Sequence, residues 1–563
     1  MAKKKQSASK QPPRTPPAKS VKVAAGNPPA GESKEESRQA PQNDAAESPV
    51  QARPEFPIAG IGASAGGLEA FTALLHRLSE APSLGVALVL VQHLSPDRDS
   101  LLPGLLAQQT HLPVMEATEG MVVEAGKVYV IPPNQQMTIA GGALRLSPRS
   151  DRAPFFPVDC FFRSLAQFAE GRAIGVVLSG GDSDGTLGLQ EIKAAGGIAI
   201  AQDPATARHP SMPNSAIATD IIDLVLSPVS IADELIRLPE HPYIRDPRQS
   251  VGTDGLAISE EDLQKIFAML RRTTGVDFRN YKLPTIKRRL HRRMLLNKTP
   301  RTGDYLDHLL EHPQEIERLY EDLLIHVTRF FREPSSFESL KQQVLPWIFS
   351  SRKGNSPVRV WVPGCSTGEE VFSLGITLLE YLGADAPATT IQIFGTDLSE
   401  AAVSCARAAL YPENIASDVS SHRLRRFFKK TDGRYQVSKA VRDLCVFARH
   451  DLTRDPPFSK LDLILCRNVL IYLGAPQQKK LMSVFHYALR PTGFLMLGSS
   501  ETVGSETDLF GVLDKKHRVY TKKLVDFAAP SMLAGHDLGT GPLNIRGALG
   551  PPSKAPSNKK PIG

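Results

Sequence analysis

Apolar and polar positions alternate regularly along two long stretches of the chain. In the first, about residues 55–238, short apolar runs such as "FPIAGIGA", "GVALVLVQHL" and "AIGVVLSG" are separated by amphipathic runs such as "LEAFTALLHRLS" and "TLGLQEIKAAG". Short apolar strands that alternate with helices are typical of a largely parallel α/β sheet. One segment departs from this pattern, because "KVYVIPPNQQMTIAGGALRLS" has the pattern of a β-hairpin.

The second stretch begins with a helical pattern over about 258–335 and then alternates strands with helices over 336–523. A polar joint with several prolines, 239–257, separates it from the first stretch. The ends of the chain, 1–54 and 524–563, are rich in Pro, Ala, Ser and Lys, which is typical of disordered tails. The predicted fold class is therefore α/β, with two doubly wound domains and a small helical domain between them.

The composition limits the number of domains and the cellular location of the protein more than it limits its function. A length of 563 residues exceeds what one core accommodates, and a net charge of +8 permits acidic or nucleic-acid partners without choosing between them. The cysteines form no CxxC pair, which argues against a disulfide framework and a structural metal site. The sequence has neither a secretory signal nor an apolar run of membrane-spanning length. These features predict a cytoplasmic protein without membrane insertion and without a bound metal.

Three chemistry-bearing residues of the first stretch each fall at or just beyond the end of a different predicted strand. They are Ser64 in "GIGASAGG", His93 in "VLVQHL" and Asp184 in "GGDSDG". Because the strand ends of a parallel sheet meet at one edge, these side chains fit a nucleophile, a base and an orienting acid. Taken singly, they are an ordinary helix cap, a strand-end histidine and a turn. The glycine spacing does not match a dinucleotide-binding GxGxxG loop, which favours the catalytic interpretation.

These segments, together with "PFFPVDCFFRSLA" and "VVLSGGDSDGTLGLQEIKAAGGIAIAQD", resemble the catalytic domain of CheB-type chemotaxis receptor methylesterases. The resemblance implies that His93 deprotonates Ser64, which attacks a glutamyl methyl ester, while Asp184 orients the imidazole. It also implies glutaminyl deamidation as a further activity. One departure is Asp182, which stands where the family usually has glycine. The extra carboxylate is expected either to raise the pKa of the histidine or to disfavour an oxyanion.

The second α/β stretch contains a nucleotide-type strand–turn–helix unit. In "VRVWVPGCSTGEEVF" a strand leads through a glycine-bearing turn into a helix, and the next strand ends at Asp397, which suits ribose hydroxyls. Glu369 and Glu370 would repel a pyrophosphate but suit the cationic groups of S-adenosylmethionine, although glutamates in a first helical turn are also ordinary partners of the helix dipole. Upstream, "LLIHVTRFFREP" places Thr328 and Arg332 on one face of a helix if that segment is helical.

The segments "GCSTGEE", "GTDLS", "ALYPENI" and "LDLILCRNVLIYL" make the region from about 258 to 523 similar to CheR-type glutamate O-methyltransferases. The resemblance implies S-adenosylmethionine as the cofactor and places Tyr472 beside the transferred methyl group. At two positions, His326 and Asp451 replace asparagines that are usual in the family. The donor contacts implied by the resemblance are His326, Thr328, Arg332, Glu369, Asp397, Asp451, Leu452, Arg467 and Asn468.

A strongly basic segment, "TIKRRLHRRMLL" at 285–296, precedes the transferase motifs. A run of charge is ordinarily a solvated helix face, and a nucleic-acid contact is a second interpretation. Because of the family resemblance, the preferred interpretation is that Arg289, Arg292 and Arg293 dock against acidic receptor helices.

The sequence therefore predicts a bifunctional enzyme that methylates and demethylates glutamates of methyl-accepting chemotaxis-type receptors. A separate sensor kinase or response regulator is a further expected partner, and nucleic acid is not. Two alternatives remain open: a nucleic-acid methyltransferase that uses the basic helix, and a signalling scaffold whose esterase half is silenced by Asp182. Nucleic-acid binding with a steep salt dependence would favour the first alternative. Receptor binding without labelling by a serine-directed phosphonate would favour the second.

Overall fold

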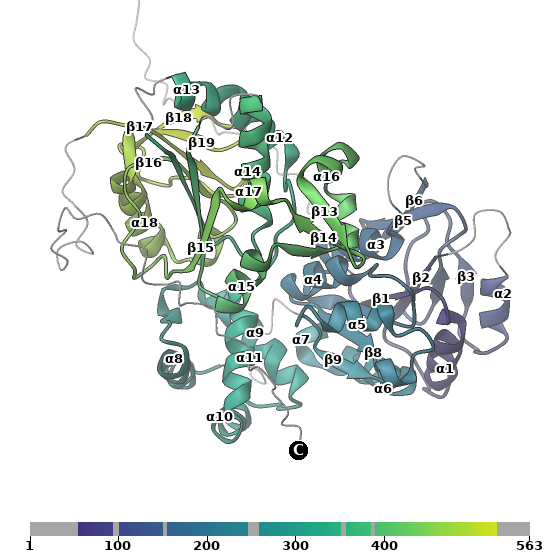
Figure 1. Ribbon diagram of the computed structural model, residues 1–563. Helices are drawn as coiled ribbons and strands as arrows, with labels where there is room; N and C mark the ends of the chain where they lie inside the picture. Colours follow the sequence, from purple (N-terminus) through teal and green to yellow (C-terminus); the bar gives the residue numbers. More distant parts are fainter. Residues whose placement is uncertain are drawn as a thin grey trace, which may run out of the picture. The chain divides into compact units, whose positions relative to one another are not determined.

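The main elements of the described part of the chain are two seven-stranded sheets with their helices and, between them in the sequence, a helical domain (Figure 1). The computed structural model describes residues 54–93, 101–149, 155–245, 258–350, 356–383 and 389–525. The expected disordered tails lie outside these residues, apart from their innermost positions. None of the helices in these ranges combines the length and apolar character that a membrane crossing requires.

The first sheet is parallel throughout, with the strand order β3-β4-β2-β1-β7-β8-β9. Both of its faces are buried: Leu74 and Leu88 belong to one core, Val89 and Phe161 to the other. Burial of both faces accounts for the nearly continuous apolar runs in the sequence. The elements are β1 (Ile58–Ala63), α1 (Gly67–Ser79), β2 (Ala87–Gln92), α2 (Leu102–Ala107), β3 (Val114–Glu116), β4 (Val128–Val130), α3 (Pro157–Ala169), β7 (Ala173–Val177), α4 (Thr186–Ala194), β8 (Ile198–Gln202), α5 (Ser211–Ile217), β9 (Leu224–Leu226), α6 (Pro228–Arg237) and α7 (Pro242–Arg245).

Two local predictions for this domain differ from the structure. The segment expected to be one hairpin divides, because β4 joins the parallel sheet and only β5 (Gln135–Ala140) and β6 (Ala143–Pro148) pair antiparallel. The first part of the expected joint forms α7, whose Tyr243 and Ile244 are buried in the core of the first domain. Burial of these two apolar side chains in an existing core is favourable, and it outweighs the tendency of a proline-rich segment to remain irregular.

The second sheet has the order β15-β11-β10-β16-β17-β19-β18. Neighbouring strands are parallel from β15 to β17, and β19 is antiparallel to both of its neighbours, β17 and β18. A separate three-stranded sheet, β12-β14-β13, is inserted after α15. The elements are α12 (Pro334–Ser339), α13 (Leu345–Ser350), β10 (Val358–Pro363), α14 (Glu369–Leu382), β11 (Ile391–Asp397), α15 (Glu400–Ala408), β12 (Leu410–Pro412), α16 (Ser421–Phe427), β13 (Phe428–Thr431), β14 (Arg434–Val437), α17 (Lys439–Arg442), β15 (Cys445–Arg449), β16 (Leu461–Cys466), α18 (Ala475–Ala488), β17 (Leu489–Leu497), β18 (Phe510–Asp514) and β19 (Val519–Lys522).

Four helices between the two sheets form the small helical domain. They share a core that includes Leu263, Leu290 and Leu319. The first begins at a serine cap, since the Ser259 side chain accepts a hydrogen bond from the Asp262 N–H. The helices are α8 (Glu260–Thr274), α9 (Leu283–Leu296), α10 (Thr302–Glu311) and α11 (Pro313–Leu324). Two α/β domains with a helical domain between them confirm the predicted fold class.

Candidate functional site

Ser64 and His93 lie side by side at the carboxyl edge of the first sheet. Strands β1 and β2 are adjacent and parallel with Ala63 opposite Gln92, so each residue directly follows its strand. On the other side of β1, β7 leads into the loop that carries Asp184. The Ser64 N–H donates to the carbonyl of Ser179 at 3.0 Å, which ties the turn after β1 to the end of β7.

His93 lies between two carboxylates. Its Nε2 is 2.8 Å from Asp184 Oδ2, and its Nδ1 is 3.2 Å from Asp182 Oδ2. Burial lowers the pKa of His93, but the hydrogen bonds to Asp182 and Asp184 outweigh it and raise the pKa to about 10. Of the two consequences expected for the extra carboxylate, the raised histidine pKa is confirmed. Among the described residues no hydrogen bond joins the Ser64 hydroxyl to His93, because both ring nitrogens face aspartates.

A cavity of about 960 Å³, measured with its open mouth, lies at the carboxyl ends of β10, β11 and β16. Asp397 ends β11, and its two carboxylate oxygens accept the N–H groups of Ser366 at 2.8 Å and Ser399 at 3.0 Å. The residues expected to contact the donor or the methyl group that line this cavity are His326, Thr328, Arg332, Asp397, Asp451, Leu452, Arg467, Asn468 and Tyr472.

The two consecutive glutamates at the start of α14 have different surroundings. Glu370 lines the cavity and accepts a hydrogen bond from Arg467 at 2.6 Å. Glu369 does not line it; its carboxylate accepts the Thr367 hydroxyl at 2.7 Å, and burial raises its pKa to about 7. The structure therefore does not place Glu369 at this cavity, as was expected for a donor contact, and places Glu370 there instead. Neighbouring residues of a helix point about 100° apart, and the sequence has no signal that selects between them.

The segment between α11 and α12 is irregular rather than helical. Ile325 and Phe331 have positive φ angles of 44° and 50°, so Thr328 and Arg332 do not share a helix face. Both nevertheless line the cavity. Tyr281, from the helical domain, also lines it and had no distinguishing signal in the sequence, because it approaches from a distant part of the chain.

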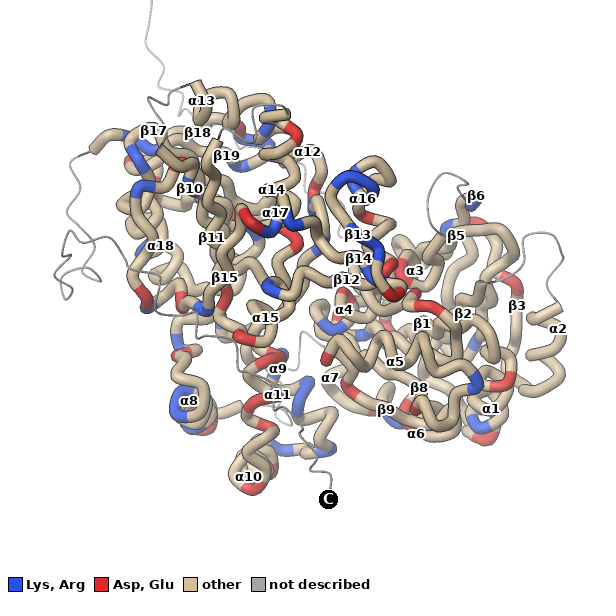
Figure 2. Tube along the Cα trace, in the orientation of Figure 1, with Lys and Arg blue, Asp and Glu red and all other residues tan. Residues whose placement is uncertain are grey.

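The three arginines of α9 that were expected to dock a receptor are buried. Arg289, Arg292 and Arg293 are only 1%, 0% and 7% exposed. Arg292 bonds to Asp322 of α11 and to Asp223 of the first domain, and Arg289 donates to backbone carbonyls at the end of α4. Arg293 pairs with a glutamate of α11. The expected docking face is therefore wrong, because each of the three guanidinium groups is buried and hydrogen-bonded inside the chain. Figure 2 shows Lys and Arg positions on α16 and β13. Of these, Arg425, Arg426, Lys429 and Lys430 are exposed.

Three family models match the chain in consecutive segments. Residues 59–235 match the CheB methylesterase model, and residues 261–324 match the all-alpha domain of CheR methyltransferase. Residues 326–519 match the SAM-binding domain of CheR methyltransferase. The description of this last model confirms S-adenosylmethionine as the cofactor.

Two relatives share sequence with the transferase region or with most of the chain. An "Uncharacterized 104.1 kDa protein in hypE 3'region" of Rhodobacter capsulatus is 38% identical over 437 residues, which are 74% of this chain and 46% of that protein. The chain thus spans about half the length of this relative. A "Putative methyltransferase Cher3" of Pseudomonas putida is 31% identical over 44% of this chain and 91% of its own.

The first domain has relatives of its own. A "Putative protein-glutamate methylesterase/protein-glutamine glutaminase" of Leptospira interrogans is 36% identical over 32% of this chain and 94% of its own. The crystal structure of the Thermotoga maritima CheB methylesterase catalytic domain is 30% identical, with a TM-score of 0.30, and is aligned over 32% of this chain and 98% of that one. The chain therefore belongs to the CheB methylesterase and CheR methyltransferase families, with a domain of each joined in one polypeptide.

Proposed function

We propose that the protein is a bifunctional receptor-modifying enzyme: one domain methylates receptor glutamates with S-adenosylmethionine, and the other hydrolyses the resulting esters. The observation that carries this proposal is the 2.8 Å contact of His93 with Asp184 at the sheet edge that also bears Ser64. The proposed substrate is a methyl-accepting chemotaxis-type receptor in the cytoplasm, in keeping with relatives named chemotaxis protein methyltransferase. Nucleic acid is not a proposed partner, because three of the arginines of the basic segment, Arg289, Arg292 and Arg293, are buried.

In the proposed esterase reaction, His93 takes the proton of the Ser64 hydroxyl, and Ser64 Oγ attacks the carbonyl carbon of the glutamyl ester. Asp184 holds the imidazole and stabilises its protonated form. Collapse of the tetrahedral intermediate releases methanol, which receives the proton from His93, and water then hydrolyses the acyl-enzyme. Because Ser64 needs a ring nitrogen of His93, displacement of Asp182 from that nitrogen is part of the proposed cycle.

In the proposed transferase reaction, the cavity residues fit the donor by their charges. Asp397 suits the ribose hydroxyls, and Arg332, which forms no ion pair among the described residues, suits the donor carboxylate. The bound donor supplies an electrophilic methyl group. A glutamate with an ordinary pKa of about 4.3 is already a nucleophile at neutral pH. The residues of the cavity, Tyr472 among them, are therefore needed for positioning and for exclusion of water rather than for proton transfer.

The proposal is tested with purified full-length protein, chemoreceptor membranes and methyl-labelled S-adenosylmethionine. Base-labile label is expected to appear on the receptor and then as methanol, and a serine-directed phosphonate is expected to block only the second step. Label that stays on the receptor regardless of the phosphonate would contradict the esterase half. Absence of label on the receptor would contradict the transferase half.

A substitution at Asp397 tests the donor site separately. Asp397→Asn is expected to weaken S-adenosylmethionine binding about tenfold, because a charge-assisted hydrogen bond becomes a neutral one. Isothermal titration calorimetry measures the change, with Asp443→Asn, at an exposed surface pair, as the control. Equal affinities of Asp397→Asn and the control would place the ribose elsewhere.

A further inference from the structure

Asp184 is held by the first turn of α3. It is 0% exposed, and the N–H groups of Val158 and Asp159 donate to its two carboxylate oxygens at 2.9 and 2.8 Å. The Gly185 N–H adds a third hydrogen bond at 2.9 Å. The position of Asp184, and through it of His93, therefore depends on where the start of α3 lies relative to the loop 182–185.

Asp159 is a second buried carboxylate in this turn, and it is 2% exposed. Its Oδ1 accepts the N–H of Gly188 at 2.6 Å, which links α3 to α4. Burial raises the pKa of Asp159 to about 7, and the nearby charge of Asp184 adds to the effect. A carboxylate in such surroundings requires hydrogen-bond donors to keep its charge and its position.

The transferase domain supplies one of these donors. Asn414 lies in the turn Glu413–Ser417 after β12 and is 0% exposed. Its Nδ2 donates to Asp159 Oδ2 at 2.5 Å and to the backbone carbonyl of Ser183 at 3.3 Å. Ser183 directly precedes Asp184. The orientation of the amide follows from these neighbours, because a flipped side chain would turn its oxygen toward two acceptors.

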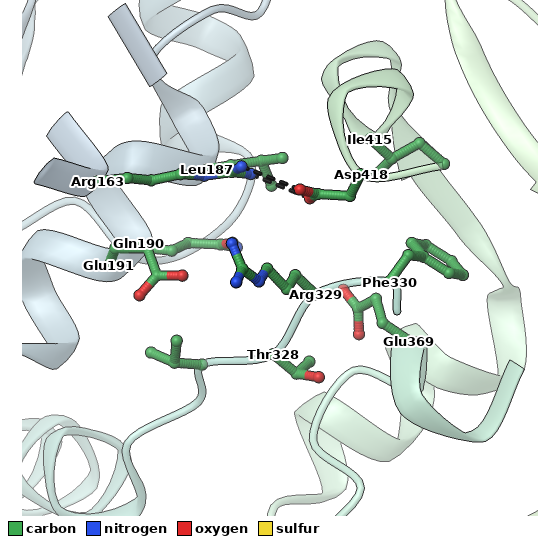
Figure 3. Close-up of a pocket in the computed structure, with 11 residues that line it drawn as sticks. Arg163, Leu187, Gln190, Glu191, Thr328, Arg329, Phe330, Glu369, Ile415 and Asp418 are labelled. Atoms are coloured by element: carbon green, nitrogen blue, oxygen red, sulfur yellow. Dashed lines mark hydrogen bonds and ion pairs between the residues drawn. The ribbon is translucent and has the colours of Figure 1, made fainter. Parts of the chain in front are cut away.

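An ion pair nearby joins the same segments without touching Asp159 or Ser183. Arg163 of α3 donates to both oxygens of Asp418 at 3.0 Å each. Figure 3 shows these two side chains extending toward each other from opposite sides of a small cavity. The pair contributes to the contact between the domains, so it offers a matched control for any effect of Asn414 that comes from that contact alone.

Given the proposed Ser64–His93–Asp184 mechanism, we infer that Asn414 is a positioning residue of the esterase. Its side-chain amide, in the transferase domain, hydrogen-bonds to both segments that hold Asp184. It donates to Asp159 in the first turn of α3 and to the backbone carbonyl of Ser183 in the loop 182–185. The esterase site is thus completed by the domain that catalyses the opposite reaction. Asn414 has no contact with Ser64 or His93 among the described residues, so it acts on turnover rather than on substrate binding.

The test compares Asn414→Ala and Asn414→Asp with wild type and with Asp418→Asn, all as full-length protein, on receptor membranes carrying labelled methyl esters. Both Asn414 variants are expected to lower kcat for methanol release about tenfold, the equivalent of one hydrogen bond to a charged group, with KM within about twofold. Asp418→Asn weakens a largely buried ion pair of the same contact, but it is expected to change kcat less than about twofold, because Asp418 hydrogen-bonds to neither Asp159 nor Ser183 in the described part of the chain. Methyl transfer to unmodified receptor, measured on the same preparations, reports that the chain is folded.

A reciprocal exchange separates positioning from general damage. Asp159→Asn combined with Asn414→Asp restores the hydrogen bond between positions 159 and 414 but not the one to the Ser183 carbonyl, so it is expected to recover part of the kcat lost in Asn414→Asp. Wild-type kcat in the Asn414 variants, a loss no larger than that of Asp418→Asn, or an exchange variant no better than the single ones would overturn the inference alone. A wild-type protein that methylates receptor but releases no more methanol than Ser64→Ala would refute the esterase proposal itself, and the role of Asn414 with it.

Discussion

Replacing Asp182 by asparagine is expected to raise the esterase activity at pH 7 by about 10- to 100-fold. With a pKa of about 10, His93 is almost entirely protonated at this pH and only about one molecule in a thousand holds a neutral imidazole that can accept the proton of Ser64. Asparagine removes the charge beside Nδ1, so the pKa of His93 falls and the neutral fraction rises. The asparagine oxygen can still accept the Asp184 N–H, which Asp182 accepts at 2.9 Å, so the loop keeps its shape.

The pH dependence of kcat/KM for methanol release checks this expectation. Wild-type activity should increase with pH up to about 10, because the base form of His93 appears only there. The rising limb of Asp182→Asn should lie at lower pH. Glu80→Gln, at an exposed ion pair of the same domain, should leave the profile unchanged. Identical profiles for wild type and Asp182→Asn would mean that Asp182 does not control the base, and would revive the silent-scaffold alternative if both are inactive.

Replacing Ser64 by alanine is expected to lower methanol release by about 10³-fold or more, because the nucleophile is lost while the rest of the site remains. Methyl transfer to the receptor should continue, since the donor cavity lies at the edge of the other sheet. As a result, receptor incubated with Ser64→Ala and labelled donor should accumulate base-labile label to a higher level than with wild type.

Ser79→Ala is the matched control for Ser64→Ala. The Ser79 hydroxyl bonds to the carbonyl of Leu75 near the end of α1, one helix length from the sheet edge, and its loss should leave methanol release unchanged. Labelling by a serine-directed phosphonate should disappear in Ser64→Ala and persist in Ser79→Ala. Undiminished methanol release by Ser64→Ala would show that the ester is cleaved by another group.

Much of the architecture could be predicted from the local pattern. Strands that are apolar along their whole length and alternate with amphipathic helices have few arrangements other than a parallel sheet covered on both faces. In such a sheet the strand ends meet at one edge, so Ser64 and His93 could be placed together without knowledge of any contact. The same reasoning placed Asp397 beside the glycine turn after β10. Where local composition was the sole guide, as in the joint before the helical domain, the burial of Tyr243 was missed.

By itself, then, the sequence determined two α/β domains and the edges at which their chemistry lies, because each follows from periodicity within one segment. Most of the residues expected at the transferase edge came instead from the resemblance to CheR-type methyltransferases. The tertiary structure decided which partner each charged group meets. Arg292 is buried against Asp223 rather than exposed to a receptor. Glu370 rather than Glu369 lines the cavity of the transferase domain. Asn414 hydrogen-bonds to Asp159, which lies beside Asp184. These outcomes depend on side chains far apart in the chain, and the cost of burying an unpaired charge or amide, which selects among them, appears only when the domains pack together.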